Sequence, residues 1–187
     1  GHLDPTTSVA IGDLDDPETT NGRPEIVAVD QRNRLRIYDN EGYEILYHAS
    51  FTGDWGSQNA TPALANIDNQ GMAEIVVAND VFFLERNADG LLSIRDIFIG
   101  GDRAIGMNGQ GPVSCVADIL GGPEMEIIAG GTVYGVPPAP EGATTPNDCI
   151  GREGDIVPQT PEEELFCERR LMIHWDAAIL QERDEPI

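Results

Sequence analysis

The chain has 187 residues, of which 40% are hydrophobic, and it carries a formal net charge of −22. The hydrophobic content is enough for one sizeable domain with its own core, and it excludes a disordered acidic tail. All 11 basic residues are arginines, which excludes a P-loop and any lysine Schiff base. The acidic balance argues against nucleic-acid binding, and no apolar run is long enough to predict a membrane span.

The first part of the chain is predicted to form four short strands. They are expected at residues 9–14, 25–30, 34–39 and 43–48. Asn40-Glu-Gly is a turn signal, so the last two strands should form a hairpin. The run Ile26-Val-Ala-Val is continuously apolar, which is typical of a strand buried on both faces.

The second part repeats this arrangement. Strands are expected at residues 63–67, 74–78, 81–86 and 91–98, with Asn87-Ala-Asp-Gly as the matching turn. Trp55 lies in the linker before this unit. Its ring could stack on a ligand, or it could be a wedge that packs between neighbouring units.

The third part begins in the same way, with strands expected at residues 114–120 and 126–129. A segment rich in Pro, Gly, Thr and Glu then runs from about residue 137 to 169, before Arg170-Leu-Met-Ile-His-Trp-Asp restores a strand pattern. We interpret this segment as an insertion between the second and third strands of the unit. It contains Pro161-Glu-Glu-Glu-Leu-Phe, which could form one or two helical turns.

The three cysteines differ in their surroundings. Cys115 lies in an apolar strand pattern and is predicted to be a buried, reduced core residue. Cys149 and Cys167 bracket much of the insertion and are predicted to form a disulfide, which would imply an oxidising compartment. The alternative is two unrelated free thiols. No C-x-x-C occurs, so zinc is not expected.

The strand pattern recurs at a fixed period. Asp13, Asn66 and Asp118 occupy equivalent positions, spaced by about 50 residues, and each is followed by a short apolar strand that begins with glutamate. Four strands per unit at this period is typical of β-propeller blades. We therefore predict an all-β chain of three consecutive four-stranded antiparallel sheets. The blades would cover about residues 8–50, 61–99 and 111–183, with the insertion at about 137–169. Three blades do not close a ring, so the chain should belong to a larger or composite propeller.

The residues from Pro62 to Val77, read as Pro-Ala-Leu-Ala-Asn-Ile-Asp-Asn-Gln-Gly-Met-Ala-Glu-Ile-Val-Val, resemble the FG-GAP/VCBS repeat family of integrin-α-like propellers. The resemblance extends over all three units outside the insertion. The family's Asp-x-Asp-x-Asp-Gly-x-x-Asp/Glu loop binds calcium, so the resemblance implies structural calcium here. Calcium takes six to eight oxygen ligands from such flexible loops.

Two of the three loops keep oxygen ligands at the matching positions. In the second unit the expected ligands are Asn66, Asp68, Gln70, the Met72 carbonyl and Glu74. In the first unit they are Asp13, Asp15, Asp16, Asn21 and Glu25. The first loop has more carboxylates, so it is expected to be the stronger site. The third loop has Leu120 where an oxygen ligand is required, so it should be empty. The alternative for all three is that Asp, Asn and Glu cap backbone amides without any metal.

No catalytic constellation accompanies these loops, and His48 and His174 have no companion pattern. The favoured interpretation is therefore a non-enzymatic, extracellular or cell-surface interaction or adhesion module that binds protein or carbohydrate. It would act together with further propeller blades from the same or another chain. The alternatives are a segment of a secreted carbohydrate-active lyase or hydrolase, and an assembly subunit that completes a propeller with other chains.

Overall fold

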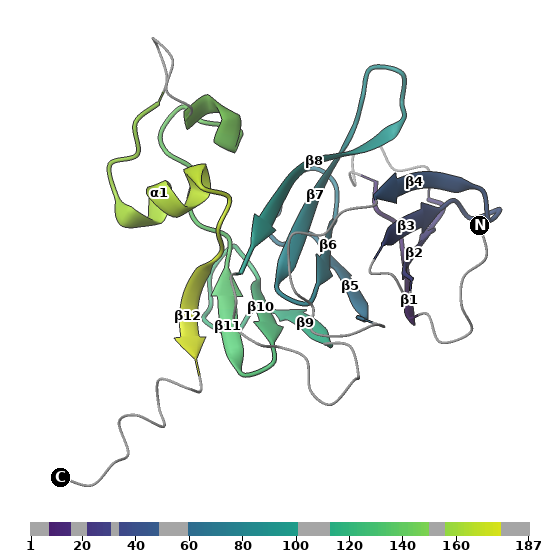
Figure 1. Cartoon of the computed structure of the whole chain (residues 1–187), viewed down its shortest axis with the longest axis horizontal. Helices are drawn as coiled ribbons and strands as arrows, with labels where there is room; N and C mark the ends of the chain where they lie inside the picture. The colour runs from purple at the N-terminus through teal and green to yellow at the C-terminus, as the bar shows by residue number, and fades with distance from the viewer. Residues whose placement is uncertain are drawn as a thin grey trace, which may run out of the picture.

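The computed structural model describes residues 8–15, 22–30, 34–48, 60–100, 113–149 and 156–176. These residues form three four-stranded antiparallel sheets that follow one another along the chain (Figure 1). Sheet 1 contains β1 (Ser8–Gly12), β2 (Glu25–Val29), β3 (Leu35–Tyr38) and β4 (Glu44–His48). Sheet 2 contains β5 (Pro62–Ala65), β6 (Glu74–Val77), β7 (Asp80–Arg86) and β8 (Leu92–Ile99). Sheet 3 contains β9 (Ser114–Ala117), β10 (Glu126–Ala129), β11 (Thr132–Gly135) and β12 (Met172–Asp176).

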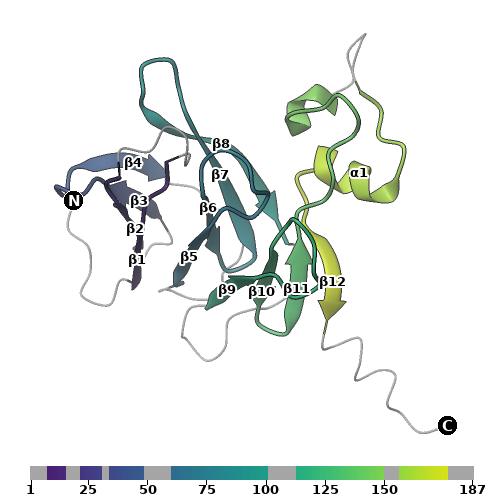
Figure 2. The ribbon, with the colours of Figure 1, turned by 180° about the vertical axis from the view of Figure 1, so that it is seen from behind.

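The prediction of an all-β chain with three four-stranded antiparallel sheets is confirmed. Within each sheet the strands are hydrogen-bonded in simple sequence order. The first strands β1, β5 and β9 lie side by side, with sheet 2 between the other two sheets (Figures 1 and 2). The core therefore runs through all three sheets.

The second strands are among the most buried strands, because each has a neighbouring strand on both edges. β6 in addition belongs to the middle sheet, which has another sheet on either side. Every residue of β6 is buried, and Ile75, Val76 and Val77 have no exposed surface. This agrees with the continuous apolar run in the sequence. In sheet 3, Ile127 and Tyr134 are completely buried in the same cluster.

The turn between β10 and β11 contains two glycines. A side chain added at the first of them should lower the stability of the fold. Gly130 has φ of 60°, in the left-handed region that glycine tolerates best. Gly130→Ala should lower the free energy of unfolding by about 1 kcal/mol. Gly122→Ala is the matched control in urea denaturation, because Gly122 does not have positive φ and has open space around it. Equal stabilities for the two variants would contradict this reading of the turn.

The insertion joins the third and fourth strands of sheet 3, β11 and β12. The sequence interpretation, which placed it between the second and third strands, is wrong on this point, because Thr132–Gly135 already forms the third strand and pairs with β12. The insertion contains a 3₁₀ turn, η1 (Pro146–Cys149), and the helix α1 (Pro161–Cys167). Thr160 and Glu163 form a capping box at the start of α1, which fixes where this helix begins.

A disulfide joins Cys149 to Cys167, as predicted. It links η1 to the end of α1. Phe166 is buried and packs against Phe98 of sheet 2, with ring centroids 5.5 Å apart. Cys115 is free, as predicted, but it is exposed. The expectation of a buried Cys115 was wrong, because that side of β9 is not covered by another described sheet.

Candidate functional site

In each of the three sheets, the loop between the first and second strands contains the same kind of hydrogen bond. The Leu14 amide donates to Glu25 Oε2 (3.0 Å), and the Ile67 amide donates to Glu74 Oε2 (2.7 Å). In sheet 3 the amides of Ile119 and Leu120 donate to Glu126 Oε2 (2.8 and 3.2 Å). The glutamate that begins each second strand therefore fixes the loop before it by accepting a hydrogen bond from the loop backbone.

The loops are further shaped by aspartate side chains that accept from the backbone. Asp13 Oδ1 accepts from the Asp15 amide (3.1 Å), and Asp68 Oδ1 accepts from the Gln70 amide (2.9 Å). Asp118 Oδ1 accepts from the Gly121 amide (2.8 Å). These are the capping contacts that the sequence left open as an alternative to metal binding. Each uses one carboxylate oxygen and is compatible with a cation at the other oxygen.

Loop 1, between β1 and β2, receives a positive charge from sheet 2. Arg86 Nε and Nη2 lie 2.7 and 2.6 Å from Asp15 Oδ1, and Nη2 lies 3.8 Å from Glu25 Oε1. Burial raises the pKa of Glu25, Asp15 and Asp13 add to this rise, and Arg86 opposes it. Asp13, Asp15 and Glu25 thus lie near enough for their charges to interact, although they do not converge as a three-residue metal-binding group. Asp16 and Asn21 lie outside the described residues.

Loop 2, between β5 and β6, brings its carboxylates together without such an arginine. Among the described residues, no ion pair joins Asp68 or Glu74 to a guanidinium. Glu74 is 2% exposed, and burial, followed by the charge of Asp68, raises its pKa to about 8. Burial also raises the pKa of Asp68. Loop 2 therefore holds two acids where the negative charge is poorly stabilised.

A buried amide oxygen in the same loop also lacks a hydrogen-bond donor. The Asn66 Nδ2 group donates to the Gly71 carbonyl (3.3 Å), whereas the buried Asn66 Oδ1 has no hydrogen-bond partner among the described residues. Gln70 is exposed and Met72 is half-buried. A buried acceptor without a donor is costly, and a cation would satisfy it.

Loop 3, between β9 and β10, differs from the other two. Leu120 is 57% exposed and supplies no side-chain oxygen, and Asp118 is exposed. Across the described ranges, no three His, Cys, Asp or Glu side chains converge as a metal-binding group. In loop 2 the other candidate oxygens belong to the Asn66 and Gln70 side-chain amides and to the Met72 carbonyl.

The loops also connect the sheets to each other. The Ala73 amide, just before Glu74, donates to the Leu14 carbonyl of loop 1 (3.1 Å). The Met125 amide, just before Glu126, donates to the Ile67 carbonyl of loop 2 (3.0 Å). Leu14 and Ile67 are the residues whose amides the glutamates cap. Loops 1 and 2 are therefore each held by their own glutamate and by the next sheet.

A cavity of about 630 Å³ adjoins loop 2. It lies between loop 2, the β7–β8 hairpin and the insertion, and its walls include Phe83, Phe98 and Phe166. Its acidic lining residues outnumber its two arginines; the acids are Asp15, Asp68, Glu74, Glu85, Asp96 and Glu124. A ligand in this cavity would meet aromatic surface and an excess of negative charge.

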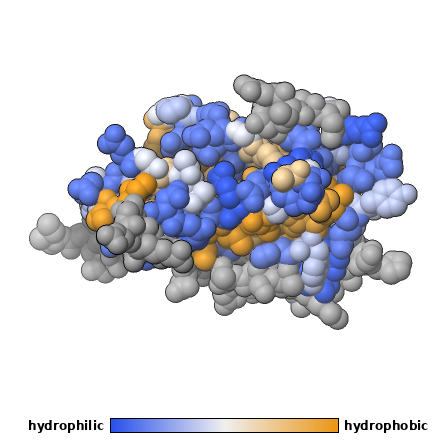
Figure 3. Space-filling model, turned by 90° about the horizontal axis from the view of Figure 1, so that it is seen from above, coloured by the Kyte–Doolittle hydropathy of each residue, from blue (hydrophilic) through white to orange (hydrophobic). Residues whose placement is uncertain are grey.

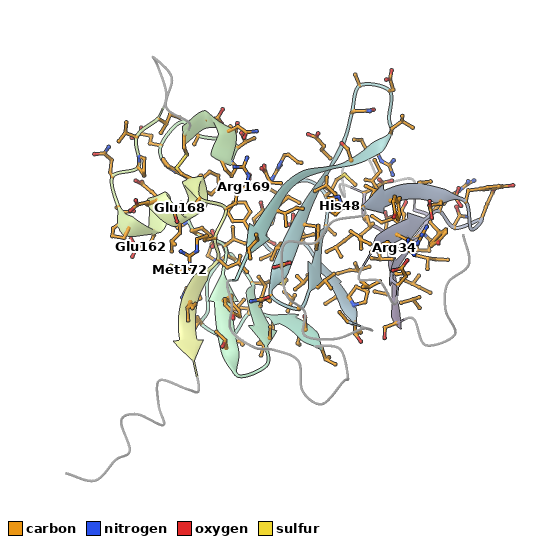
Figure 4. All side chains as sticks on the ribbon, in the orientation of Figure 1. Arg34, His48, Glu162, Glu168, Arg169 and Met172 are labelled. Atoms are coloured by element: carbon orange, nitrogen blue, oxygen red, sulfur yellow. A yellow bond between two sulfur atoms is a disulfide. The ribbon has the colours of Figure 1, made fainter. Side chains whose placement is uncertain are left out.

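Asp96 anchors the insertion beside this cavity. Its Oδ1 accepts from Arg169 Nε (3.1 Å), and Arg95 Nε lies 3.6 Å from Oδ2. Burial raises the pKa of Asp96, and Arg169 opposes the rise. Figure 4 shows Arg169 at the junction between α1 and β12, next to β8. Arg86, Asp96 and Arg169 could not be predicted as site residues from the sequence, because their partners lie more than 70 residues away and no local pattern marks them.

The remaining candidates do not join this cluster. His48 packs edge-on against Phe82, with ring centroids 6.1 Å apart, and His174 lies on β12 in another sheet. Trp55 lies outside the described residues. Seen from above, the surface is largely hydrophilic with a hydrophobic band across it (Figure 3). Within the described residues, the helices are too short to cross a membrane.

Comparisons with protein-family models, curated proteins and solved structures give no match to this chain.

Proposed function

We propose that this chain is an interaction module built from calcium-stabilised propeller repeats of the FG-GAP/VCBS kind. The observation that carries the proposal is loop 2, where a buried Glu74, the neighbouring Asp68 and the unpaired Asn66 Oδ1 all favour a cation. The repeated hydrogen bonds between loops support the arrangement of the sheets as successive blades. The disulfide supports an extracellular or cell-surface location, because such bonds persist in oxidising compartments.

In loop 2 the calcium would be held by Asn66, Asp68, Gln70, the Met72 carbonyl and Glu74. In loop 1 it would be held by Asp13, Asp15 and Glu25, with Asp16 and Asn21 completing the set. The ion would neutralise buried carboxylates and so hold the first strand pair of each sheet together. The protein or carbohydrate ligand would bind at the neighbouring cavity.

Two features have opposite effects on the relative calcium affinity of loops 1 and 2. Loop 1 has more carboxylates, which raises calcium affinity. Its Asp15, however, is already paired with Arg86, which calcium would have to displace. Loop 2 has fewer carboxylates but no such competitor among the described residues.

Calcium at millimolar concentration should raise the melting temperature, because it binds only the folded state. Asp68→Asn should remove the loop 2 share of this gain, and Asp15→Asn should remove the loop 1 share. Arg86→Gln should increase calcium affinity at loop 1, since it removes a positive charge that competes with calcium for Asp15. Differential scanning calorimetry and isothermal titration calorimetry measure these effects.

Asp118→Asn is the matched control, because it makes the same change in the loop that lacks an oxygen at Leu120. It should leave the calcium response unchanged. The absence of any calcium-dependent shift in the wild-type protein would leave backbone capping as the sole role of these side chains.

A further inference from the structure

The row of three sheets ends in two exposed faces with apolar side chains. On β9 of sheet 3, Cys115 is exposed, and in the loop that follows this strand Ile119 is 51% exposed and Leu120 57% exposed. On sheet 1, Val9 is 48% exposed and Ile11 is 65% exposed. Figures 1 and 2 show that sheets 1 and 3 lie on opposite sides of sheet 2.

The contact between sheets 1 and 2 shows which side of a first strand meets which neighbour. A Cβ on Gly12 would lie 3.1 Å from Leu64 Cδ1, and the Thr61 and Ser8 hydroxyl oxygens are 3.2 Å apart. Ser8 and Gly12 therefore face sheet 2. Because side chains alternate along a strand, Val9 and Ile11 point to the opposite side.

The repeat extends this rule to both ends of the row. Ile11 occupies the position of Leu64, which packs against the preceding sheet. Cys115 occupies the position of Ala10, on the side that faces the following sheet. The two exposed faces thus have the same complementary character as the faces that are buried between sheets 1 and 2.

The backbone contacts between loops follow the same direction. Leu14 and Ile67 each accept a hydrogen bond from the residue before the glutamate of the next sheet. The carbonyl of Ile119 is the next acceptor in this series. In sheet 1 the residue before Glu25 is Pro24, which has no amide hydrogen to donate.

We propose that the exposed face of sheet 3 binds the exposed face of sheet 1 in a second copy of this chain. The contact continues the packing already present between the sheets, and two copies joined at both ends close a ring of six sheets. The inference deepens the propeller part of the proposed function and is independent of calcium. Pro24 leaves each junction between copies one hydrogen bond short. The charge of −22 on each copy opposes association, so salt should strengthen it.

The test is analytical ultracentrifugation of the full chain in EDTA, at low and high salt. The wild-type protein should form a dimer of twice 20.2 kDa, more tightly at high salt. Ile11→Asp and Cys115→Asp should each abolish dimerisation, and both residues are exposed enough for the fold to tolerate the change. Mixing the two variants should partly restore the dimer, since one of its two junctions is then unchanged.

Two further measurements test the register of the contact. Pro24→Ala should tighten dimerisation by roughly 2- to 10-fold for each junction, the range expected for one added hydrogen bond. The Cys115 thiol should react with a maleimide more slowly in the dimer than in the Ile11→Asp variant.

A wild-type monomer at every salt and protein concentration, with freely reactive Cys115, would overturn the inference. A dimer that either aspartate variant leaves intact, or that Pro24→Ala does not tighten, would also overturn it. Dimerisation in EDTA without any calcium-dependent change in melting temperature would contradict the calcium proposal but not the dimer. A calcium-dependent rise in melting temperature in a protein that stays monomeric would contradict only the proposed contact between copies.

Discussion

Glu74→Gln should remove the largest part of the stability loss that the calcium-free protein shows as the pH rises from 4.5 to about 8. Burial raises the pKa of Glu74 from 4.5 to about 8 in the folded state. Between these values the folded protein holds a proton that the unfolded chain has released, so the free energy of unfolding falls with pH. At about 1.4 kcal/mol per pH unit, the loss is of the order of 3–5 kcal/mol.

The measurement is urea denaturation in EDTA across this pH range. Glutamine keeps an acceptor for the Ile67 amide but cannot ionise, so the variant should match the wild type at pH 4.5 and exceed it at pH 8. Burial raises the pKa of Glu25, Asp68 and Asp96 as well, so a smaller slope of the same sign should remain. Glu126→Gln, the equivalent change in sheet 3, is the matched control. A wild-type stability that is flat or rises over this range would contradict the prediction.

The Cys149→Ser/Cys167→Ser double variant should be less stable than the wild type by about 3 kcal/mol, the loop-closure value for a bridge across some 18 residues. The disulfide holds η1 against the end of α1, where Phe166 meets Phe98. Without it, the insertion must be ordered by Phe166 and the Arg169–Asp96 pair. Hydrogen exchange should therefore increase first in residues 161–167.

Cys115→Ser is the control for loss of a thiol, because Cys115 is free and exposed, and its stability should be unchanged. Urea denaturation of the wild type with and without a reducing agent provides an independent check. A double variant as stable as the wild type would show that the packing of Phe166 and the Arg169–Asp96 pair hold the insertion without the disulfide.

The arrangement of strands could be predicted from the sequence because it depends on local patterns. Alternation, continuous apolar runs and turn signals such as Asn87-Ala-Asp-Gly act over a few residues, and the repeat supplied three consistent examples. One or two helical turns were considered for the segment that begins at Pro161, and the structure has the helix α1 there, which starts at a capping box formed by Thr160 and Glu163. The pairing of Cys149 with Cys167 followed from their positions around the insertion.

The features that depend on contacts between distant segments could not be predicted. Arg86 meets Asp15 across 71 residues, and nothing near either residue marks the other. Cys115 sits in an apolar pattern, but its exposure is set by what covers β9, which the pattern does not contain. The placement of the insertion failed for a related reason, because β12 resembles the third strand of sheet 1 in sequence.

The candidate site shows the same division. The positions of Asp68 and Glu74 followed from the repeat, whereas their electrostatics did not. The pKa of Glu74 is raised because β6 is buried among its neighbouring strands. In loop 1, by contrast, Arg86 from another sheet stabilises the negative charge of Asp15. Spacing identifies which oxygens converge, but burial and distant partners decide which of them require a cation.

The place of the insertion also has a consequence for the order of folding. Sheets 1 and 2 can each be completed from a nearly continuous stretch of chain, because their successive strands are joined by short connections. The fourth strand of sheet 3 reaches β11 only after the whole insertion has been traversed, which adds loop-closure entropy and slows its formation. Ile99 at the end of sheet 2 then bonds through its backbone to both Arg169 and Leu171. On a chain emerging from the ribosome, we therefore expect sheet 3 to close last, against a sheet 2 that is already formed.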